Sequence, residues 1–481
     1  MTEYTCDICV VAAGPAGLAA SVQAAEKGAD VILIEKQKQV GGAANMGMGI
    51  LGIGTKYQKR QMYDISVEKA LKMYMEYTHY NVDIRLMKRY FEQSAGTIEW
   101  LEGMGVEFEG AYKYFTKSEP TWHIVKSPRG IGPAAAKTMN EKLLERAKEL
   151  GVRVLFQTSG KKILKEDGKV CGVLAQTAGG EEITIHSKAA VIATGGAGAN
   201  KEMLHEETGY TFMKDMFSFA VPGCTGDGLK MAWEAGVEHL PVRIEQAATP
   251  EGLGGLSNSV SNIMGQGNLL VNLEGKRFMN EEDMQNVTFL SNALSAQKER
   301  LGFSVVDTGI VEYYVKNGVD EICMDRPDPD VSDFPDAAKK AKEKGHKGLF
   351  IADTLEELAE MTGVNKENFL KTVEDYNRYC DSTDEEFFKP KKLMRKLVKA
   401  PFYAVRFRPG GYGTVGGIRI NENCEACDAD HNPVPGLYAA GADACNIYND
   451  SYMFLLPGNS MGFAVNTGRI AGMSAAEYIN N

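Results

Sequence analysis

The chain has 481 residues, of which 44% are hydrophobic and 24% are charged, and its formal net charge is −11 at pH 7. This length and composition are typical of a globular enzyme with two or three domains. The negative charge argues against a protein that binds nucleic acid or an anionic membrane surface. No stretch of 18 apolar residues occurs, so the sequence predicts no integral membrane segment.

The cysteines and the N-terminus indicate a reducing, cytoplasmic location. The nine cysteines are an odd number at scattered spacings, which does not suit a disulfide framework. The first expected strand begins within the first six residues or so, which leaves no room for a signal peptide. Cys6 and Cys9 suit the core of that strand. Cys424 and Cys427 lie in a polar turn with His431 and carboxylates as the only further ligands, so we expect no metal site.

The N-terminal segment predicts a strand, a glycine turn, a helix and a second strand. Ile8–Val11 and Val31–Ile34 suit buried strands. The turn Ala12–Gly17 predicts a dinucleotide-binding unit, because its glycines and the helix N-terminus bring backbone amides close to a pyrophosphate. Glu35 follows at the distance where an acid accepts hydrogen bonds from ribose hydroxyls. The first glycine of the usual motif is Ala12, so an ordinary βαβ unit remains an alternative.

Further glycine turns suit the same ligand. The ribbon after Glu35 lets main chain lie against a flat ring, although a mobile surface loop is the alternative. Ala189–Thr194 predicts a strand whose carboxyl end faces the ligand crevice of a doubly wound sheet. Asp227 opens a helix, either as its cap or as a hydroxyl ligand. The predicted cofactor-binding residues are Ala13, Gly14, Pro15, Ala16, Gly17, Glu35, Lys36, Gly41, Gly42, Ala43, Ala44, Gly47, Gly49, Thr158, Ala193, Thr194, Gly195, Gly196, Asp227, Gly441, Ala442, Asn459, Ser460 and Met461.

The middle of the chain differs in pattern from both ends. Residues 1–240 and 401–481 share glycine turns between strands and helices, whereas residues 241–400 carry charged helices and alternating strands. We therefore expect an α/β fold in which a Rossmann-like domain, formed by the two ends, carries an inserted α+β domain.

Four segments in this order resemble a flavoprotein family. They are AAGPAGLAA…LIEK, GVRVLFQT…VIATGGAGAN, GYGTVGGIRI and GLYAAGA…PGNSMGFAVNTGRIAG, and they cover most of the chain. The family is that of FAD-dependent fumarate reductases and succinate dehydrogenase flavoproteins, with urocanate reductases and 3-ketosteroid dehydrogenases. The resemblance implies FAD along the first glycine turn, an inserted domain that caps the flavin, and oxidation or reduction of an activated carbon–carbon bond.

Departures from the family narrow this expectation. The glycine-rich ribbon lacks the histidine that holds covalent FAD, so non-covalent FAD is expected. The family's ribityl-binding acid is replaced by Ala442, with Asp443 beside it. Three groups that hold and protonate a dicarboxylate are also missing, which disfavours fumarate and succinate. The residues at or near those positions are Gln285 or Asn286, Tyr412 or Gly413, and Leu455 or Leu456.

Aromatic and basic residues near the C-terminus are the catalytic candidates. We expect reduction of an enone- or enoate-like double bond, with hydride from flavin N5 and a proton from Tyr412, Tyr452 or Tyr403. Arg406 or Arg408 would lower the tyrosine pKa. Core packing of the tyrosines and surface ion pairs of the arginines are the alternatives. The helix beginning near Ser460 would place its dipole against the flavin.

Two further functions and several electron donors stay open. The same site would serve a dehydrogenase that introduces a double bond next to a carbonyl, and a non-catalytic scaffold would keep the fold alone. No second nucleotide turn or haem motif occurs, so we expect an external electron donor, either NAD(P)H or a flavodoxin or ferredoxin. The basic segment Lys389–Lys399 is the candidate docking surface for an acidic carrier.

Overall fold

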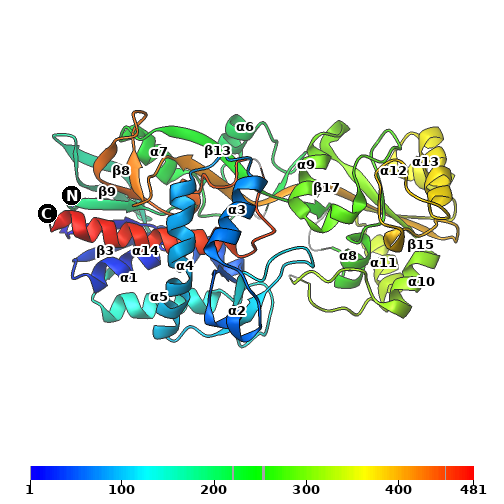
Figure 1. Ribbon diagram of the computed structural model, residues 1–481. Coiled ribbons are helices and arrows are strands. Elements are labelled where there is room, and N and C mark those ends of the chain that lie inside the picture. Colours follow the sequence, from blue (N-terminus) through cyan, green and yellow to red (C-terminus); the bar gives the residue numbers. More distant parts are fainter. Residues whose placement is uncertain (1, 219–220, 252–254, 325, 450, 481) are drawn as a thin grey trace.

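The computed structural model describes residues 2–218, 221–251, 255–324, 326–449 and 451–480. The described chain forms two lobes that are joined along two long strands (Figure 1). Both termini lie at the end of the first lobe that is remote from the second (Figure 1).

A six-stranded sheet forms the centre of the first lobe. Its strand order is β18-β19-β11-β2-β3-β7, and all pairs are parallel except β18 with β19. Every residue of β2, β3 and β11 is buried, because both faces of a parallel sheet are covered. The strands span Ile8–Val11 (β2), Val31–Glu35 (β3), Arg153–Phe156 (β7), Ala189–Ile192 (β11), Glu425–Cys427 (β18) and Pro433–Ala439 (β19).

Two helices from opposite ends of the chain, α1 (Pro15–Glu26) and α14 (Asn459–Ile479), pack against each other and the sheet (Figure 1). Small residues allow their backbones to approach closely. A Cβ added at Gly468 would lie 2.2 Å from the carbonyl oxygen of Ala16, and one at Gly472 would lie 2.3 Å from that of Ala20. These glycines therefore fix how the C-terminal helix sits on the nucleotide-binding helix.

Two smaller sheets and six further helices complete the first lobe. One sheet has the order β1-β10-β9-β8, and the other has the order β4-β6-β5. The strands are Thr2–Thr5 (β1), Gly49–Leu51 (β4), Phe108–Tyr112 (β5), Trp122–Val125 (β6), Thr158–Glu166 (β8), Lys169–Thr177 (β9) and Glu182–His186 (β10). The helices are Lys56–Arg60 (α2), Val67–Tyr77 (α3), Ile84–Gly103 (α4), Lys137–Glu149 (α5), Lys201–Thr208 (α6) and Asp227–Glu234 (α7).

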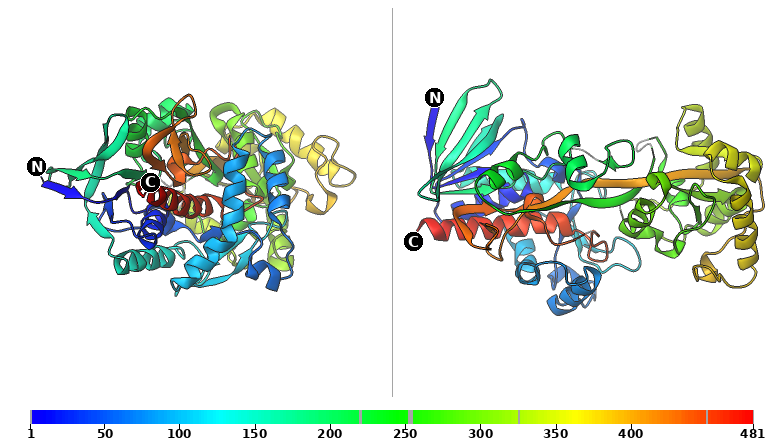
Figure 2. Two further views of the ribbon diagram at one scale, coloured as in Figure 1. Left: turned by 60° about the vertical axis from the view of Figure 1, so that its left-hand side comes forward. Right: turned by 90° about the horizontal axis from the view of Figure 1, so that it is seen from above.

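The strands β13 (His239–Pro250) and β17 (Phe402–Ile418) pair antiparallel and run from the first lobe into the second (Figure 2). In the second lobe β17 pairs with β15 and β16, and β15 pairs with β14. The remaining elements are Phe217–Ser218 (β12), Leu269–Val271 (β14), Gly302–Asp307 (β15), Leu349–Ala352 (β16), Asn258–Met264 (α8), Val287–Ser295 (α9), Thr308–Asn317 (α10), Phe334–Glu343 (α11), Leu355–Thr362 (α12) and Lys366–Tyr379 (α13).

The architecture confirms the predicted class, an α/β nucleotide-binding fold with a second, mixed lobe inserted into it. The second lobe has its own hydrophobic core, whose buried residues run from Ala248 to Phe407. The division at residues 240 and 400 stays a prediction, since β13 and β17 cross from one lobe to the other near those positions without a break.

Candidate active site

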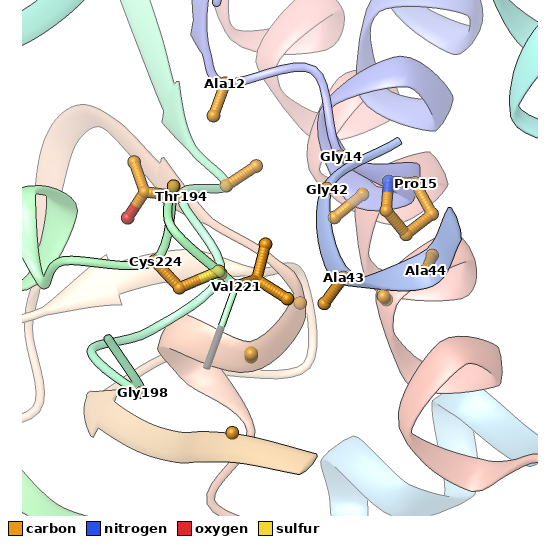
Figure 3. Close-up of a pocket in the computed structure, with 18 of the residues that line it drawn as sticks. Ala12, Gly14, Pro15, Gly42, Ala43, Ala44, Thr194, Gly198, Val221 and Cys224 are labelled. Atoms are coloured by element: carbon orange, nitrogen blue, oxygen red, sulfur yellow. The ribbon is translucent and has the colours of Figure 1, made fainter. Parts of the chain in front are cut away.

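A cavity opens where β2, β3 and β11 end and α1 begins. Figure 3 shows Gly14, Pro15 and Ala43 on one side of it, facing Thr194 and Cys224 on the other. The cavity lies at the carboxyl ends of parallel strands, which is where doubly wound sheets bind their ligands. The predicted cofactor residues that line it are Gly14, Pro15, Ala16, Glu35, Lys36, Gly42, Ala43, Ala44, Thr158, Ala193, Thr194, Gly195, Asp227, Gly441, Ala442, Ser460 and Met461.

Seven predicted cofactor residues do not line the cavity, and several of them have a packing role instead. A Cβ at Gly17 would lie 1.9 Å from the carbonyl oxygen of Ala12, and one at Gly49 would lie 1.9 Å from that of His123. A Cβ at Gly47 would lie 2.3 Å from Met461 Sδ. These glycines bring neighbouring segments together behind the cavity wall. The seven residues are Ala13, Gly17, Gly41, Gly47, Gly49, Gly196 and Asn459.

The N-terminus of α1 suits a pyrophosphate. Gly14 is the N-cap, no side chain caps the helix, and no acid lies in its first turn. The first-turn amides therefore present a positive dipole end to which the helix itself adds no acidic side chain. A Cβ at Gly14 would meet nothing closer than 3.9 Å, so main chain forms the cavity floor there.

Two acidic side chains order the same part of the cavity. Glu35 Oε2 accepts a hydrogen bond from the Ala13 amide at 2.7 Å, which fixes the carboxylate at the tip of β3. Lys36 Nζ forms an ion pair with Asp227 Oδ2 at 2.7 Å and donates to Thr225 Oγ1. Carboxylates held in this way remain able to accept hydrogen bonds from ribose hydroxyls.

The turn after β11 is held by Asp443, a residue that the sequence analysis did not assign to a role. The side chain lies in the short helix η5 (Gly441–Ala444) and is fully buried. Its carboxylate accepts hydrogen bonds from the amides of Thr194, Gly195 and Gly196 and from the Thr194 hydroxyl. Burial raises the pKa of this carboxyl, and the amide hydrogen bonds partly offset that effect.

The structure separates the three candidate tyrosines. Tyr412 lines the cavity and is 38% exposed. Tyr452 is buried just behind the wall, where its hydroxyl accepts a hydrogen bond from the Ser460 amide at 3.3 Å. Tyr403 lies in the core of the second lobe with its ring 5.2 Å from that of Phe334, and it does not line the cavity.

The candidate arginines Arg406 and Arg408 are not among the residues that line the cavity. Arg406 donates to Glu251 Oε1 at 2.7 Å, and Arg408 Nε donates to Glu251 Oε2 at 3.1 Å. Arg408 precedes Tyr412 by four residues, which is about 13 Å along a strand. Burial raises the pKa of Tyr452 well above its ordinary value, so the structure gives no support for the expected lowering by an arginine.

Glu245 is a cavity residue that the sequence analysis missed. It lies on β13 and lines the cavity together with Tyr412. Burial raises the pKa of its carboxyl to about 7, and the neighbouring side chains of Ser460 and Tyr452 act in the opposite direction. No motif signals this glutamate, because its neighbours in the site are distant in the sequence.

Four of the six cations in the basic segment Lys389–Lys399 form ion pairs within the chain. Lys389 is 2% exposed and donates to the Tyr376 hydroxyl. These ion pairs are Lys389 with Glu281, Arg395 with Asp320, Lys396 with Asp381 and Lys399 with Glu312. An acidic carrier would have to compete with these carboxylates, so the segment gives no support for the predicted docking surface.

Sites of other kinds do not emerge from the described residues. All nine cysteines are free, and Cys424 and Cys427 are buried. Within the described ranges no three histidine, cysteine, aspartate or glutamate side chains are grouped to hold a metal ion. No helix in the described part of the chain combines the length and the apolar character needed to span a membrane.

The fold and the cavity define a dinucleotide-binding α/β protein with an inserted second lobe, and comparisons identify the family. The family described as "FAD binding domain" matches residues 7–461. A vinyl phenol reductase of Lactiplantibacillus plantarum is 32% identical over 98% of this chain and 96% of its own length. The open conformation of a flavocytochrome c3 fumarate reductase is 27% identical, with a TM-score of 0.73 over 99% of this chain and 79% of that one.

A 3-ketosteroid Δ4-(5α)-dehydrogenase of Rhodococcus jostii RHA1 shares the fold, with a TM-score of 0.79 and 23% identity over 99% of this chain and 98% of that one. The chain therefore belongs to the FAD-binding family, which confirms the predicted resemblance and cofactor. It is an FAD-dependent oxidoreductase, and its relatives include reductases that act on carbon–carbon double bonds. The α1 amides and the Glu35 carboxylate fit the diphosphate and ribose of FAD.

Proposed function

We propose that this protein reduces a carbon–carbon double bond in an uncharged substrate, such as a vinyl phenol or an enone. The main support for this proposal is the lack of unpaired positive charge among the described residues that line the cavity. Among the described lining residues Lys36 is the single cation, and Asp227 neutralises it. Lys36, Asp227 and Glu35 lie in the part that fits the FAD ribose, so Glu245 is the acidic or basic residue that remains for a substrate among the described lining residues. A dicarboxylate such as fumarate would meet no free positive partner there, and burying its charges unpaired would be costly.

Bound FAD supplies the two electrons of the reaction as a hydride to one alkene carbon. The protein must bind the substrate, exclude water and provide a proton for the neighbouring carbon. The hydroxyl of Tyr412 is the candidate donor to a phenolic or carbonyl oxygen, because it is the described tyrosine on the cavity wall. The relationship to the vinyl phenol reductase, which extends over nearly the whole of both chains, supports a substrate of this size and polarity.

The electrons come from an external donor in this proposal, either NAD(P)H or a small reduced protein. The protein therefore has two partners in this proposal, which are a small unsaturated substrate and an electron donor. The ion pairs that engage Arg395, Lys396 and Lys399 make the basic segment less suited to an acidic carrier, which favours a small donor that reaches the cavity itself.

Stopped-flow reoxidation of the dithionite-reduced holoenzyme tests this proposal without the natural donor. Anaerobic mixing with 4-vinylphenol, an aromatic enone, urocanate and fumarate should reoxidise the flavin with one of the uncharged alkenes at least 100-fold faster than with fumarate, a difference of about 3 kcal/mol. Fast reoxidation by fumarate would refute the uncharged-substrate proposal. Bleaching of the oxidised enzyme by a saturated ketone, without reoxidation by alkenes, would instead support the dehydrogenase.

A further inference from the structure

We propose that Glu245 delivers the proton to the substrate alkene, and that Tyr452 and Ser460 hold its carboxyl in position. This inference rests on the proposed alkene reduction and names a residue that neither motif nor fold assigns. It replaces the arginine or tyrosine donor that the sequence led us to expect. Glu245 lines the cavity, whereas Tyr403, Arg406 and Arg408 do not.

A β-bulge directs Glu245 into the cavity. Ile244 pairs with Thr414 and Gln246 pairs with Gly411, so Glu245 alone on β13 stands opposite Tyr412 and Gly413 on β17. A bulge of two residues against one breaks the regular alternation of side chains and re-aims those beside it. The effect here is to bring Glu245 and Tyr412, which lie far apart in the sequence, to one wall.

The partners of Glu245 are neutral groups. The side chains of Ser460 and Tyr452 lie beside its carboxyl and lower its pKa, and the Ser460 amide donates to the Tyr452 hydroxyl at 3.3 Å. Cys445 lines the cavity, and the Tyr448 ring centroid lies 4.7 Å from that of Tyr452; burial raises the pKa of Cys445 and of Tyr448. These buried groups stay neutral near pH 7, so none of them supplies a positive charge that would keep Glu245 ionised.

This environment suits a general acid. Burial raises the pKa of Glu245 to about 7, while the side chains of Ser460 and Tyr452 act in the opposite direction. A carboxylic acid with a pKa near the working pH is both protonated in a large fraction of molecules and able to transfer its proton. Tyr452 has a pKa well above its ordinary value, which makes it a stable hydrogen-bond donor and a poor acid.

The proposed step balances as follows. The alkene π bond breaks, one carbon forms a C–H bond with the hydride that reduced FAD supplies, and the other forms a C–H bond with the Glu245 proton. The alkene is reduced by two electrons, FAD is oxidised by two electrons, and Glu245 is left as a carboxylate. The carboxylate regains a proton from solvent, and the external donor reduces FAD again.

The test compares the holoenzymes of wild type, Glu245→Gln, Glu245→Asp and Glu251→Gln. The last is a matched control, because Glu251 directly follows β13 but pairs with Arg406 and Arg408 outside the cavity wall. With 4-vinylphenol, or the best alkene of the panel, the wild-type reoxidation rate should fall about tenfold per pH unit above pH 7. The Glu245→Gln rate should be about 10²- to 10⁴-fold lower and independent of pH. Glu245→Asp should keep a pH-dependent rate, and Glu251→Gln should follow wild type.

Infrared difference spectra of the oxidised holoenzymes give a readout that does not depend on turnover. A protonated carboxyl band should titrate near pH 7 in wild type and in Glu251→Gln and should be absent in Glu245→Gln. An unchanged rate and pH profile in Glu245→Gln, or loss of rate with no lost carboxyl band, would overturn the role of Glu245. Failure of every alkene to reoxidise wild type would instead refute the proposed function, and a carboxyl band that titrates in wild type but not in Glu245→Gln would still establish the protonated glutamate.

Discussion

Substitution of Asp443 by asparagine should loosen the turn that forms one side of the cavity. The carboxylate accepts from four donors, which are the amides of Thr194, Gly195 and Gly196 and the Thr194 hydroxyl. Asparagine offers one oxygen and directs an NH₂ group at the donors that the second oxygen served. If the asparagine oxygen accepts from the Thr194 and Gly195 amides, no acceptor is left for the Gly196 amide. In wild type that amide donates to Asp443 Oδ1 at 2.8 Å.

The expected loss of stability follows from the number of donors that asparagine leaves without an acceptor. The Thr194 hydroxyl can rotate to accept from the new NH₂ group, so a single buried amide is left without a partner. An orphaned buried donor costs about 1–3 kcal/mol, and the facing N–H groups add repulsion. We therefore expect Asp443→Asn to lower the free energy of unfolding by about 2–4 kcal/mol. Because Ala193, Thr194 and Gly195 line the cavity, FAD should also be released more readily.

Urea unfolding followed by flavin fluorescence measures both effects, and Asp30→Asn is a suitable control. Asp30 forms an ion pair with Arg153 and its side chain is 53% exposed, so its neutralisation should cost less than about 1 kcal/mol. If Asp443→Asn retained wild-type stability and FAD affinity, the carboxylate would not be what holds the turn, and the hydrogen-bond argument would fail.

Two further perturbations test the packing and the electrostatics. Gly468→Ala places a Cβ 2.2 Å from the Ala16 carbonyl oxygen and should destabilise the protein by at least about 1–3 kcal/mol in equilibrium unfolding. Gly96→Ala, in a helix with nothing within 4 Å of the new Cβ, should be neutral or slightly stabilising, and equal effects would refute the close-packing argument. Glu245 binds a proton up to pH 7 when folded and up to about 4.5 when unfolded, so its contribution to stability falls as pH rises through that interval. Between pH 5 and pH 8 wild type should lose about 2.5 kcal/mol relative to Glu245→Gln, and parallel stability curves would contradict the raised pKa.

The sequence predicted the nucleotide-binding part of this site because its signals are local. The strand, turn, helix and acid of the first βαβ unit lie within about thirty residues of one another, and each leaves its own pattern of glycines or apolar residues. The same holds for the turn after β11, where the glycines that admit a ligand follow directly on a buried strand. Such features are fixed by neighbouring residues, so no knowledge of the tertiary structure is needed to recognise them.

The charged and aromatic residues were harder to place, because their surroundings come from distant segments. Arg406 and Arg408 looked available in the sequence, yet Glu251, which directly follows the antiparallel strand β13, accepts hydrogen bonds from both. Likewise, the carboxylates that neutralise the basic segment after Lys389 include Asp320 and Glu312, which adjacent sequence does not reveal. Charge patterns alone therefore overestimate how much of a protein's charge is free to bind a partner.

The position of Glu245 in the cavity could not be predicted from the sequence pattern of its strand. Regular alternation along β13 would leave Glu245 as one polar residue among several, since Arg243 and Gln246 are also only partly buried. Opposite Glu245, β17 has one extra residue, and this bulge breaks the regular alternation of side chains. The glycines on either side of Tyr412 are the only sign of the bulge in the sequence of the two strands. The placement of Glu245 thus depends on the register between β13 and β17, two strands that the whole second lobe separates in the sequence. Four of the five candidate donors, which are Tyr403, Arg406, Arg408 and Tyr412, lie on β17, whereas Glu245, whose pKa burial raises to about 7, lies on β13 beside it.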